Sequence, residues 1–239
     1  MSKILCVTGT GTEVGKTAVS LAILLWAKEM GLRAGYIKLV QCGSRIQDPE
    51  HFQGDADWIE EAQPSAFSIS SVYTFQDPVS PHLAAEKTGA WIDPEWIYEQ
   101  VSAAAERCDL LVIEGAGGAA TPFTREGLSL AELAAKAEWP CLIVSQPGLG
   151  ALHQTRTTAH FLVSRGARIA GFVMSQTTPD LPPVYSDNVT SLKAMIPTHY
   201  FGLVPYCPGL HKRLPLSPAV ALLFARSLGD GLKAWWGTP

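Results

Sequence analysis

The stretch GTGTEVGKT, from Gly9 to Thr17, combines residue types that bind phosphate. Glycines let backbone N–H groups approach an anion closely, and a helix that starts after them adds its dipole. Lys16 would bring a positive charge to the β- and γ-phosphates, and the Thr17 hydroxyl would reach a magnesium ion. The common loop has glycine where Thr10 stands, and here the glycine comes one residue earlier. The alternative is a glycine-rich turn between a strand and a helix that binds no ligand.

Three further side chains suit a site that handles phosphate. Glu114 ends the apolar run DLLVIE, and Lys38 lies inside the apolar run YIKLV, where a charge either reaches the end of a strand or is costly to bury. Asp55 follows a glycine in GDAD. Because Mg²⁺ prefers few carboxylates together with phosphate oxygens and water, Thr17, Asp55 and Glu114 form a candidate metal site. The alternatives are a solvated loop residue for Glu114, a helix N-cap for Asp55 with Asp57 competing, and a surface lysine for Lys38.

The chain supplies alternating strands and helices to hold these residues. Short apolar runs predict strands, and longer runs of helix-forming residues predict helices. The predicted strands cover residues 3–8, 33–40, 109–115, 140–146, 168–175 and 200–205. The predicted helices cover residues 16–31, 55–62, 93–108, 129–138, 152–166, 184–195 and 217–228. We expect a proline-marked connection over residues 64–81. The alternation predicts an α/β fold of three layers, with a mostly parallel sheet and helices on both faces. We expect one domain over residues 1–239, with the tail from about residue 208 poorly assigned.

Composition narrows the class of protein. The 239 residues are 47% apolar and 17% charged, as in a soluble globular protein. The net charge of −4 gives no basic excess for nucleic acid. Five cysteines without a CxxC pair fit reduced thiols rather than disulfides or a zinc site. We find no signal-peptide pattern and no apolar run long enough for a membrane span, so we expect a cytoplasmic protein without a membrane partner.

The loop resembles that of the dethiobiotin synthetases, whose pattern is Gly-Thr-x-Thr-x-Val-Gly-Lys-Thr. YIKLVQCG, GDAD, VSPH, VIEGAGG, GLG, AGFV and GLVP follow in the order of that family. The resemblance covers roughly 200 residues and leaves the tail out. The matching loop positions are Gly9, Thr10, Thr12, Val14, Gly15, Lys16 and Thr17.

The resemblance implies a P-loop NTPase fold and a reaction. With ATP and Mg²⁺, the family joins CO₂ to 7,8-diaminononanoate and closes the ureido ring of dethiobiotin, through a carbamate and a carbamic-phosphoric mixed anhydride. Carbamate and γ-phosphate are both anions and must nearly touch, so cations must lie between and around them. Lys16 and Lys38 are the implied catalytic residues.

The resemblance also implies binding residues. Those for nucleotide are Thr12, Glu13, Val14, Gly15, Lys16, Thr17, Ala18, Asp55, Glu114, Gly115, Ala116, Gly117, Ser175, Gln176, Val204, Pro205 and Tyr206. Those for the diamine are Cys42, Ser80, Gly150, His153 and Asn188. His82, in the same VSPH run as Ser80, is a further candidate; for both residues the alternative is a turn set by the proline between them.

The chain departs from the family pattern at some of these positions. The family often has serine or threonine where Cys42 stands and asparagine where His153 stands. It commonly has an asparagine that reads the adenine where this chain has Ser175 and Gln176.

The family implies a homodimer in which a helix of the second subunit, here 184–195, reaches the substrate carboxylate. A tyrosine of some relatives aligns with Asn188, so Tyr185 or Asn188 would make this contact; the alternative is an ordinary amphipathic surface helix.

Two other functions compete with the synthetase. A partitioning-type ATPase switch would carry a further lysine where Thr10 and Gly11 stand. A catalytically silent nucleotide-binding regulatory module is the other alternative, against which the retained Lys16, Lys38 and Glu114 count.

Overall fold

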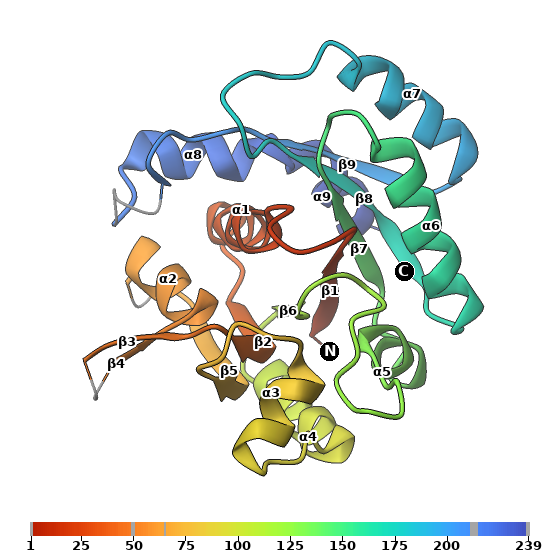
Figure 1. Cartoon of the computed structure of the whole chain (residues 1–239). Helices are drawn as coiled ribbons and strands as arrows, with labels where there is room; N and C mark the ends of the chain where they lie inside the picture. Colours follow the sequence, from red (N-terminus) through yellow and green to blue (C-terminus); the bar gives the residue numbers. More distant parts are fainter. Residues whose placement is uncertain (1, 49–50, 65, 211–214, 238–239) are drawn as a thin grey trace.

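A seven-stranded parallel sheet forms the centre of the protein (Figure 1). The computed structural model describes residues 2–48, 51–64, 66–210 and 215–237. The strand order is β5-β2-β6-β1-β7-β8-β9, and every neighbouring pair is parallel. The strands are β1 (Lys3–Gly9), β2 (Ala34–Cys42), β5 (Ser68–Phe75), β6 (Leu110–Glu114), β7 (Cys141–Ser145), β8 (Ile169–Ser175) and β9 (His199–Val204). The inner strands are buried on both faces, which explains why they read as continuous apolar runs.

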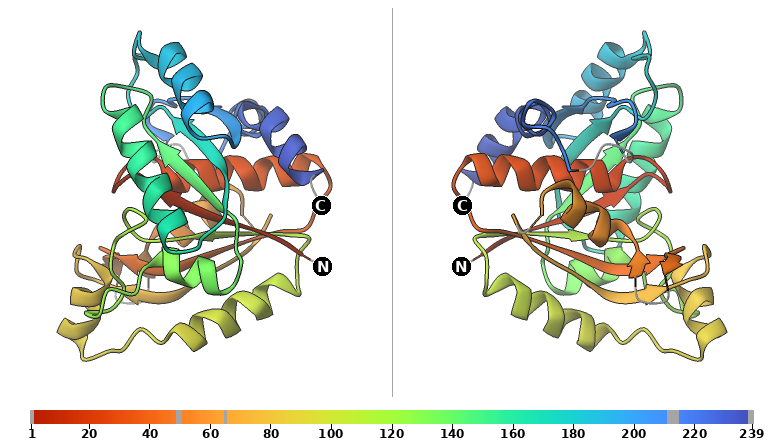
Figure 2. Two further views of the ribbon diagram at one scale, coloured as in Figure 1. Left: turned by 90° about the vertical axis from the view of Figure 1, so that its right-hand side faces the viewer. Right: turned by 90° about the vertical axis from the view of Figure 1, so that its left-hand side faces the viewer.

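Helices cover both faces of this sheet (Figure 2). One face packs against α1 (Lys16–Glu29), α2 (Asp55–Ala62), α8 (Pro218–Ser227) and α9 (Gly229–Trp236). The other packs against α3 (Pro81–Thr88), α4 (Pro94–Ala105), α5 (Leu130–Lys136), α6 (Ala151–Ser164) and α7 (Tyr185–Met195). The predicted three-layer α/β fold is confirmed, and so are the predicted strands, which correspond to β1, β2, β6, β7, β8 and β9. None of the helices in the described parts of the chain combines the length and apolar character needed to cross a bilayer.

The prediction for residues 64–81 was wrong. Instead of a connection, this stretch contains β5, which pairs with β2 from Gly35–Ser68 to Cys42–Phe75. The strand SISSVYTF lies at the edge of the sheet and is only partly buried, so it lacks the apolar run that revealed the inner strands. The prolines that suggested a connection flank the strand on either side and lie outside it.

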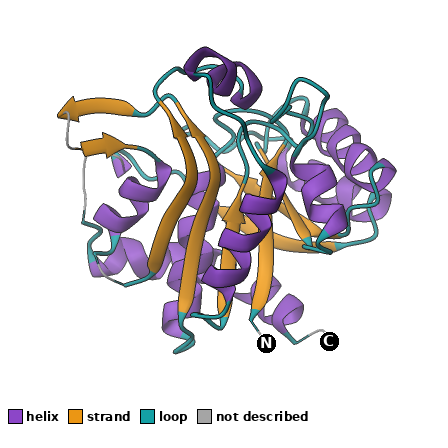
Figure 3. Ribbon diagram, turned by 90° about the horizontal axis from the view of Figure 1, so that it is seen from below, coloured by secondary structure: helices purple, strands orange, loops and turns teal. Residues whose placement is uncertain are grey.

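A small hairpin and the helices α3 and α9 were also absent from the sequence expectation. A small antiparallel hairpin, β3 (Arg45–Asp48) with β4 (His51–Gln53), projects beyond the main sheet in Figure 3. In the tail, α8 is followed by α9, whose Trp235 packs against Phe201 of β9. The Lys3 ammonium donates to the carbonyl oxygen of Trp236 at 2.7 Å, so the end of α9 is joined to the start of β1.

Candidate active site

The phosphate-binding loop connects β1 to α1. The strand ends at Gly9 and the helix begins at Lys16. Glu13 and Gly15 have φ values of 58° and 92°, which place the loop backbone in the left-handed region. A Cβ atom on Gly9 would lie 2.7 Å from Cγ2 of Val14, so the loop folds back over a strand end that only glycine can provide. This packing gives a reason for glycine at position 9, one residue earlier than in the common loop.

Lys16 lies over this loop. Its Nζ donates to the carbonyl oxygen of Gly11 at 2.9 Å, and the residue is buried. Burial lowers its pKa from the ordinary 10.5, and the attraction of Glu114 only partly offsets this effect. A lysine held in this way places its cation where the loop would receive phosphates.

A buried carboxylate, Glu114, forms the centre of the site. Its side chain is fully buried, and both of its oxygens accept hydrogen bonds. Oε1 accepts from Lys38 Nζ at 2.7 Å and from Thr17 Oγ1 at 3.1 Å. Oε2 accepts from Ser20 Oγ at 2.7 Å and from the Tyr36 hydroxyl at 3.1 Å. A buried charge persists only with such partners, so the alternative of a solvated loop residue for Glu114 is wrong.

Lys38 joins two carboxylates. In the ladder between β2 and β6, Lys38 is the direct partner of Glu114. Its Nζ lies 2.6 Å from Oδ2 of Asp55 and 2.7 Å from Oε1 of Glu114, and its side chain is 5% exposed. Burial opposes the charge, but the two carboxylates outweigh it and raise the pKa of Lys38 above its ordinary value. The ammonium is therefore charged, and the alternative of a surface lysine is wrong.

Gly54, not Asp55, is the N-cap of α2, and Asp57 rather than Asp55 bonds to its backbone, so the Asp55 carboxylate can pair with Lys38. The Asp57 carboxylate accepts from the backbone N–H of Gly54 at the start of α2, at 2.8 Å. The backbone N–H of Asp55 donates to Oε1 of Gln41 at 3.0 Å, which joins the helix start to β2. Asp57 therefore stabilises the start of the helix, and Asp55 pairs with Lys38.

The hydroxyl and carboxylate oxygens around Glu114 are suitable ligands for a magnesium ion. Thr17 and Asp55 contact Glu114 or its lysine partner, so one hydroxyl and two carboxylates converge. Nowhere in the described ranges do three or more His, Cys, Asp or Glu side chains gather into a metal site of their own. Few carboxylates, with room for phosphate oxygens and water, are the environment that Mg²⁺ prefers.

The loop after β6 lies beside the phosphate-binding loop. The N–H of Gly115 donates to Val7 and that of Ala119 to Gly9, both on β1. Gly117 has a φ of 64°, and a Cβ there would lie 2.4 Å from Oγ1 of Thr121. The glycines after Glu114 therefore permit a tight turn next to the loop, with Ala116 between them.

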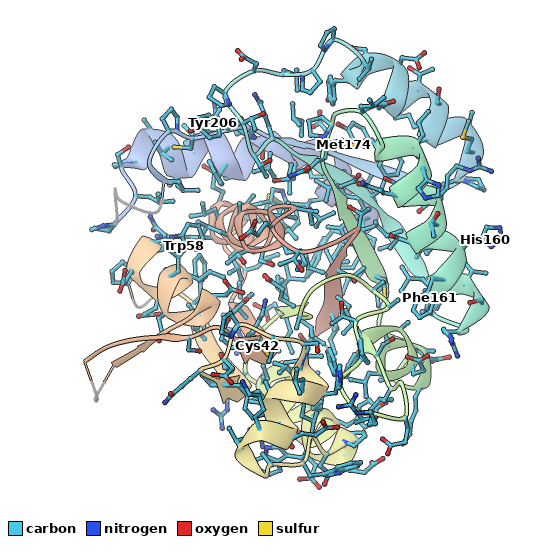
Figure 4. The ribbon with its side chains drawn as sticks, in the orientation of Figure 1. Cys42, Trp58, His160, Phe161, Met174 and Tyr206 are labelled. Carbon is cyan, nitrogen blue, oxygen red and sulfur yellow. The ribbon has the colours of Figure 1, made fainter. Side chains whose placement is uncertain are left out.

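The predicted base-side residues lie at the ends of β8 and β9. Ser175 is the ladder partner of Val204 and is buried against the loop, because a Cβ on Gly15 would overlap its Oγ at 2.1 Å. Gln176 donates from its amide to the carbonyl oxygen of Pro179 at 2.9 Å. Pro205 and Tyr206 continue the chain, and Figure 4 shows Tyr206 above α1.

The predicted substrate side lies across α1 from these residues. Figure 4 places Cys42 on the opposite side of α1 from Tyr206. Burial raises the pKa of the Cys42 thiol to about 11, so it is protonated at neutral pH. Ser80 precedes α3, and its side chain makes no capping bond to the helix. In the described structure, the buried polar atoms without a hydrogen-bond partner include Ser44 Oγ, two residues after Cys42, and His82 Nδ1, on α3.

A second group of predicted residues gathers at the start of α6. Gly150, with a φ of 92°, is the N-cap of that helix, and His153 is exposed one turn later. The amide of Asn188 on α7 donates to the carbonyl oxygens of Pro147 and Gly148, each at 3.0 Å. In Figure 1 these elements lie on the opposite side of β1 from α2 and β2. The structure thus keeps this group apart from the Glu114 centre.

Sequence reasoning missed two residues that contact Glu114. Ser20 is four residues after Lys16 on α1, and Tyr36 is two residues before Lys38 on β2. Helical and strand periodicity place each on the same face as the candidate it follows or precedes. That periodicity is the signal that would have found them.

Comparisons with known proteins agree with this geometry. A family model described as an AAA domain matches residues 3–213. An ATP-dependent dethiobiotin synthetase of Anaeromyxobacter sp. (strain K) is 34% identical, covering 96% of this chain and 97% of the relative. One of Geobacillus kaustophilus is 31% identical, covering 89% of each.

Among solved structures, the septum site-determining protein MinD of Pyrococcus horikoshii, complexed with Mg-ADP, aligns with a TM-score of 0.60. The alignment covers 99% of this chain and 98% of that one at 17% identity, which supports the shared fold alone. By its sequence relatives and its fold, the chain belongs to the dethiobiotin synthetase family of P-loop proteins.

Proposed function

We propose that this protein uses ATP and Mg²⁺ to join CO₂ to 7,8-diaminononanoate and close the ureido ring of dethiobiotin, a step of biotin biosynthesis. The observation that carries the proposal is the Glu114 centre. Two carboxylates, a buried lysine and the loop hydroxyl of Thr17 meet at the start of α1, next to Lys16. A protein that only bound nucleotide would have little use for a second buried cation there.

The reaction has three steps. One amine of the substrate attacks CO₂, forms a C–N bond and loses a proton, which leaves a carbamate. A carbamate oxygen then attacks the γ-phosphorus of ATP, and ADP departs. Finally the second amine attacks the carbonyl carbon of this mixed anhydride, the ring closes, and phosphate leaves together with a proton.

The two lysines counter the charge that this sequence gathers. Carbamate and γ-phosphate repel each other strongly in a site that excludes water, so fixed cations nearby lower the barrier. Lys16 lies over the loop, and Lys38 lies within β2, beside Glu114 at the end of β6. Lys38 thus comes from the substrate side and Lys16 from the nucleotide side.

Thr17, Asp55 and Glu114 would hold the magnesium ion. When bound, the ion neutralises charge on phosphate oxygens and orients them. The Lys38 ammonium lies 2.6 Å from Asp55 and 2.7 Å from Glu114, so it contacts two of these candidate ligands. Asp55 and Glu114 would therefore bind the metal ion as well as pair with Lys38.

Buried polar atoms without partners support a substrate site on the Cys42 side of α1. Unpaired buried groups are rare in native proteins, and a polar ligand is one way to satisfy them. Ser44 Oγ and His82 Nδ1 would contact the amines or the carbamate. Cys42 and Ser80 flank this region.

We further propose that the protein acts as a homodimer in the cytoplasm. Leu149 is 99% exposed, and Leu181 and Val184 are each 42% exposed; we call these three residues the α6–α7 patch. The loops that carry them are in contact, because a Cβ on Gly148 would lie 3.4 Å from Cγ of Pro182. Exposed leucine at a loop tip next to the predicted substrate residue Gly150 suits a surface that a second copy covers. That copy would exclude water from the mixed anhydride, which water would otherwise hydrolyse.

Asn188 and Tyr185 stay candidates for the contact across this dimer. In the described chain, the Asn188 amide holds the 147–148 turn, and the Tyr185 hydroxyl bonds that of Tyr200 at 2.8 Å. Within its own chain, Asn188 therefore holds the loop that leads to Gly150. The substrate carboxylate would then meet Tyr185 or Asn188, near Gly150 and His153.

The product identifies the function directly. Purified protein is incubated with 7,8-diaminononanoate, ¹³C-bicarbonate, ATP and Mg²⁺, and the mixture is analysed by mass spectrometry. We expect dethiobiotin that carries one ¹³C atom, and none when the diamine, ATP or Mg²⁺ is omitted. Nucleotide binding without this product would favour the regulatory module instead.

A further inference from the structure

The two oxygens of the Glu114 carboxylate have different surroundings. Oε1 contacts Lys38 and Thr17, which are the charged and hydroxyl groups of the candidate site. Among the described residues, Oε2 accepts hydrogen bonds from two neutral hydroxyls, those of Ser20 at 2.7 Å and Tyr36 at 3.1 Å. The carboxylate therefore has one oxygen directed at the site and one held by groups behind it.

The two hydroxyls come from different layers of the fold. Ser20 lies on α1, is fully buried, and follows Thr17 by almost one helical turn. Tyr36 lies on β2, is 1% exposed, and shares its face of the strand with Lys38. One bond reaches Oε2 from the helix and the other from the neighbouring strand. Together with the backbone of β6 they fix the rotation of the carboxyl group.

We propose that Ser20 and Tyr36 are positioning residues, which lock the Glu114 carboxylate so that Oε1 alone is presented to the magnesium ion. This inference rests on the proposed role of Glu114 as a metal ligand. Ligand carboxylates are commonly held by hydrogen bonds of this kind, and loss of such a partner typically weakens metal affinity by about 10–100-fold. Neither residue is placed to touch substrate, because both are buried behind the carboxylate.

The competing explanation is that the two hydroxyls only satisfy a buried charge. Any donor lost from a buried carboxylate destabilises the fold, whether or not the carboxylate binds metal. The two explanations differ in the coupling between Mg²⁺ and nucleotide. A positioning role predicts that this coupling falls, whereas a purely structural role lowers only the free energy of unfolding.

Calorimetry measures that coupling. The affinity of the protein for a non-hydrolysable ATP analogue is determined in EDTA and again in saturating Mg²⁺, and the ratio is the coupling factor. The variants are Ser20→Ala and Tyr36→Phe, which each remove one hydroxyl, and Glu114→Gln, which tests the ligand itself. Tyr98→Phe is the matched control, because its hydroxyl bonds the carbonyl oxygen of Leu133 at 3.3 Å on α5, away from the Glu114 centre.

We expect Ser20→Ala and Tyr36→Phe each to reduce the coupling about tenfold, with an unchanged affinity in EDTA. Tyr98→Phe keeps the wild-type coupling. If Glu114→Gln loses the coupling while both hydroxyl variants keep it within twofold, the positioning role is wrong and the metal role of Glu114 stands. If Glu114→Gln keeps it too, both roles are wrong. Because no product is measured, these outcomes are independent of whether the ring closes.

Discussion

Two regions of the molecule are predicted to contact substrate, and they are built differently. The first lies where β2 and β6 pair, and the second lies at the start of α6 and α7. At the first, Lys38 pairs with Asp55 at 2.6 Å and with Glu114 at 2.7 Å, and Lys38 and Glu114 are buried. At the second, Leu149 is 99% exposed and His153 points to solvent. The first region pairs its charged groups within one chain, whereas the second exposes an apolar side chain to solvent. Buried charges need their partners within the folded chain, so this part of the site is formed before substrate binds. The residues that exclude water from the substrate could instead come from a second copy.

Lys38→Ala should have the largest effect, because it removes the cation that both carboxylates share. We expect turnover to fall by at least about 100–1000-fold, as when a fixed group that stabilises transition-state charge is lost. The variant should also be less stable by about 3–5 kcal/mol, because Glu114 keeps its buried charge without its partner. Steady-state kinetics and denaturant unfolding measure the two effects.

Lys136→Ala is the control for this variant. Lys136 pairs with Glu95 at 2.7 Å, but both side chains are more than 60% exposed. Exposed pairs contribute little, so turnover and stability should stay near wild type. Near-normal turnover in Lys38→Ala would remove the proposed difference between the two regions.

Leu149→Asp should act on the second region and leave the first intact. A charged side chain at the tip of the α6–α7 patch would be buried in the dimer, so we expect association to weaken by at least about tenfold. Sedimentation over a range of concentrations measures the dimer, and assays at matched concentrations show whether activity follows it.

Leu223→Asp provides the comparison for that change. Leu223 is 51% exposed on α8 and lies outside the patch. We expect an unchanged dimer in this variant. Equal effects of the two substitutions would show that the patch is not the interface.

The sequence revealed the first region better than the second. Inner strands are buried on both faces, so their apolar runs were readable. Lys38 inside one run and Glu114 at the end of another were identified from their residue types and their places in those runs. The edge strand β5 was missed because its serines and partial burial resemble a loop. Ser20 and Tyr36 were missed because their role depends on which strands are neighbours, and β2 and β6 are far apart in the chain.

The α6–α7 end was less readable for another physical reason. Its predicted residues rested on family resemblance, and this chain differs from the family at 153 and 188. The structure shows that Asn188 on α7 holds the 147–148 turn, a contact between a helix and a distant loop that no local pattern encodes. Periodicity within one chain also does not indicate which side chains of a second copy would reach the substrate.

The smallest effect is expected from pH, and it separates the two lysines. Burial lowers the pKa of Lys16 below 10.5, whereas the paired carboxylates raise that of Lys38 above it. As pH rises, Lys16 therefore loses its proton first, and affinity for the ATP analogue should begin to fall below pH 10.5. The stabilising pairing of Lys38 is fully present below its unfolded pKa and is lost only as pH rises through the higher folded value.

Calorimetry of analogue binding at increasing pH measures this difference. In Lys16→Ala the decline in affinity below pH 10.5 should disappear, because the titrating group is gone. If the decline persists unchanged in that variant, another group is responsible.

Mixed dimers test most directly whether one active site is built from two copies. Lys38→Ala disables the centre in its own chain, and a Tyr185→Ala, Asn188→Ala double variant disables the side that reaches across. Each should be nearly inactive alone. After the two are unfolded together, refolded and equilibrated at equal amounts, half of the dimers combine one of each, and each has one intact site. We predict recovery of about a quarter of wild-type activity; a mixture no more active than the average of its two components would contradict the shared site.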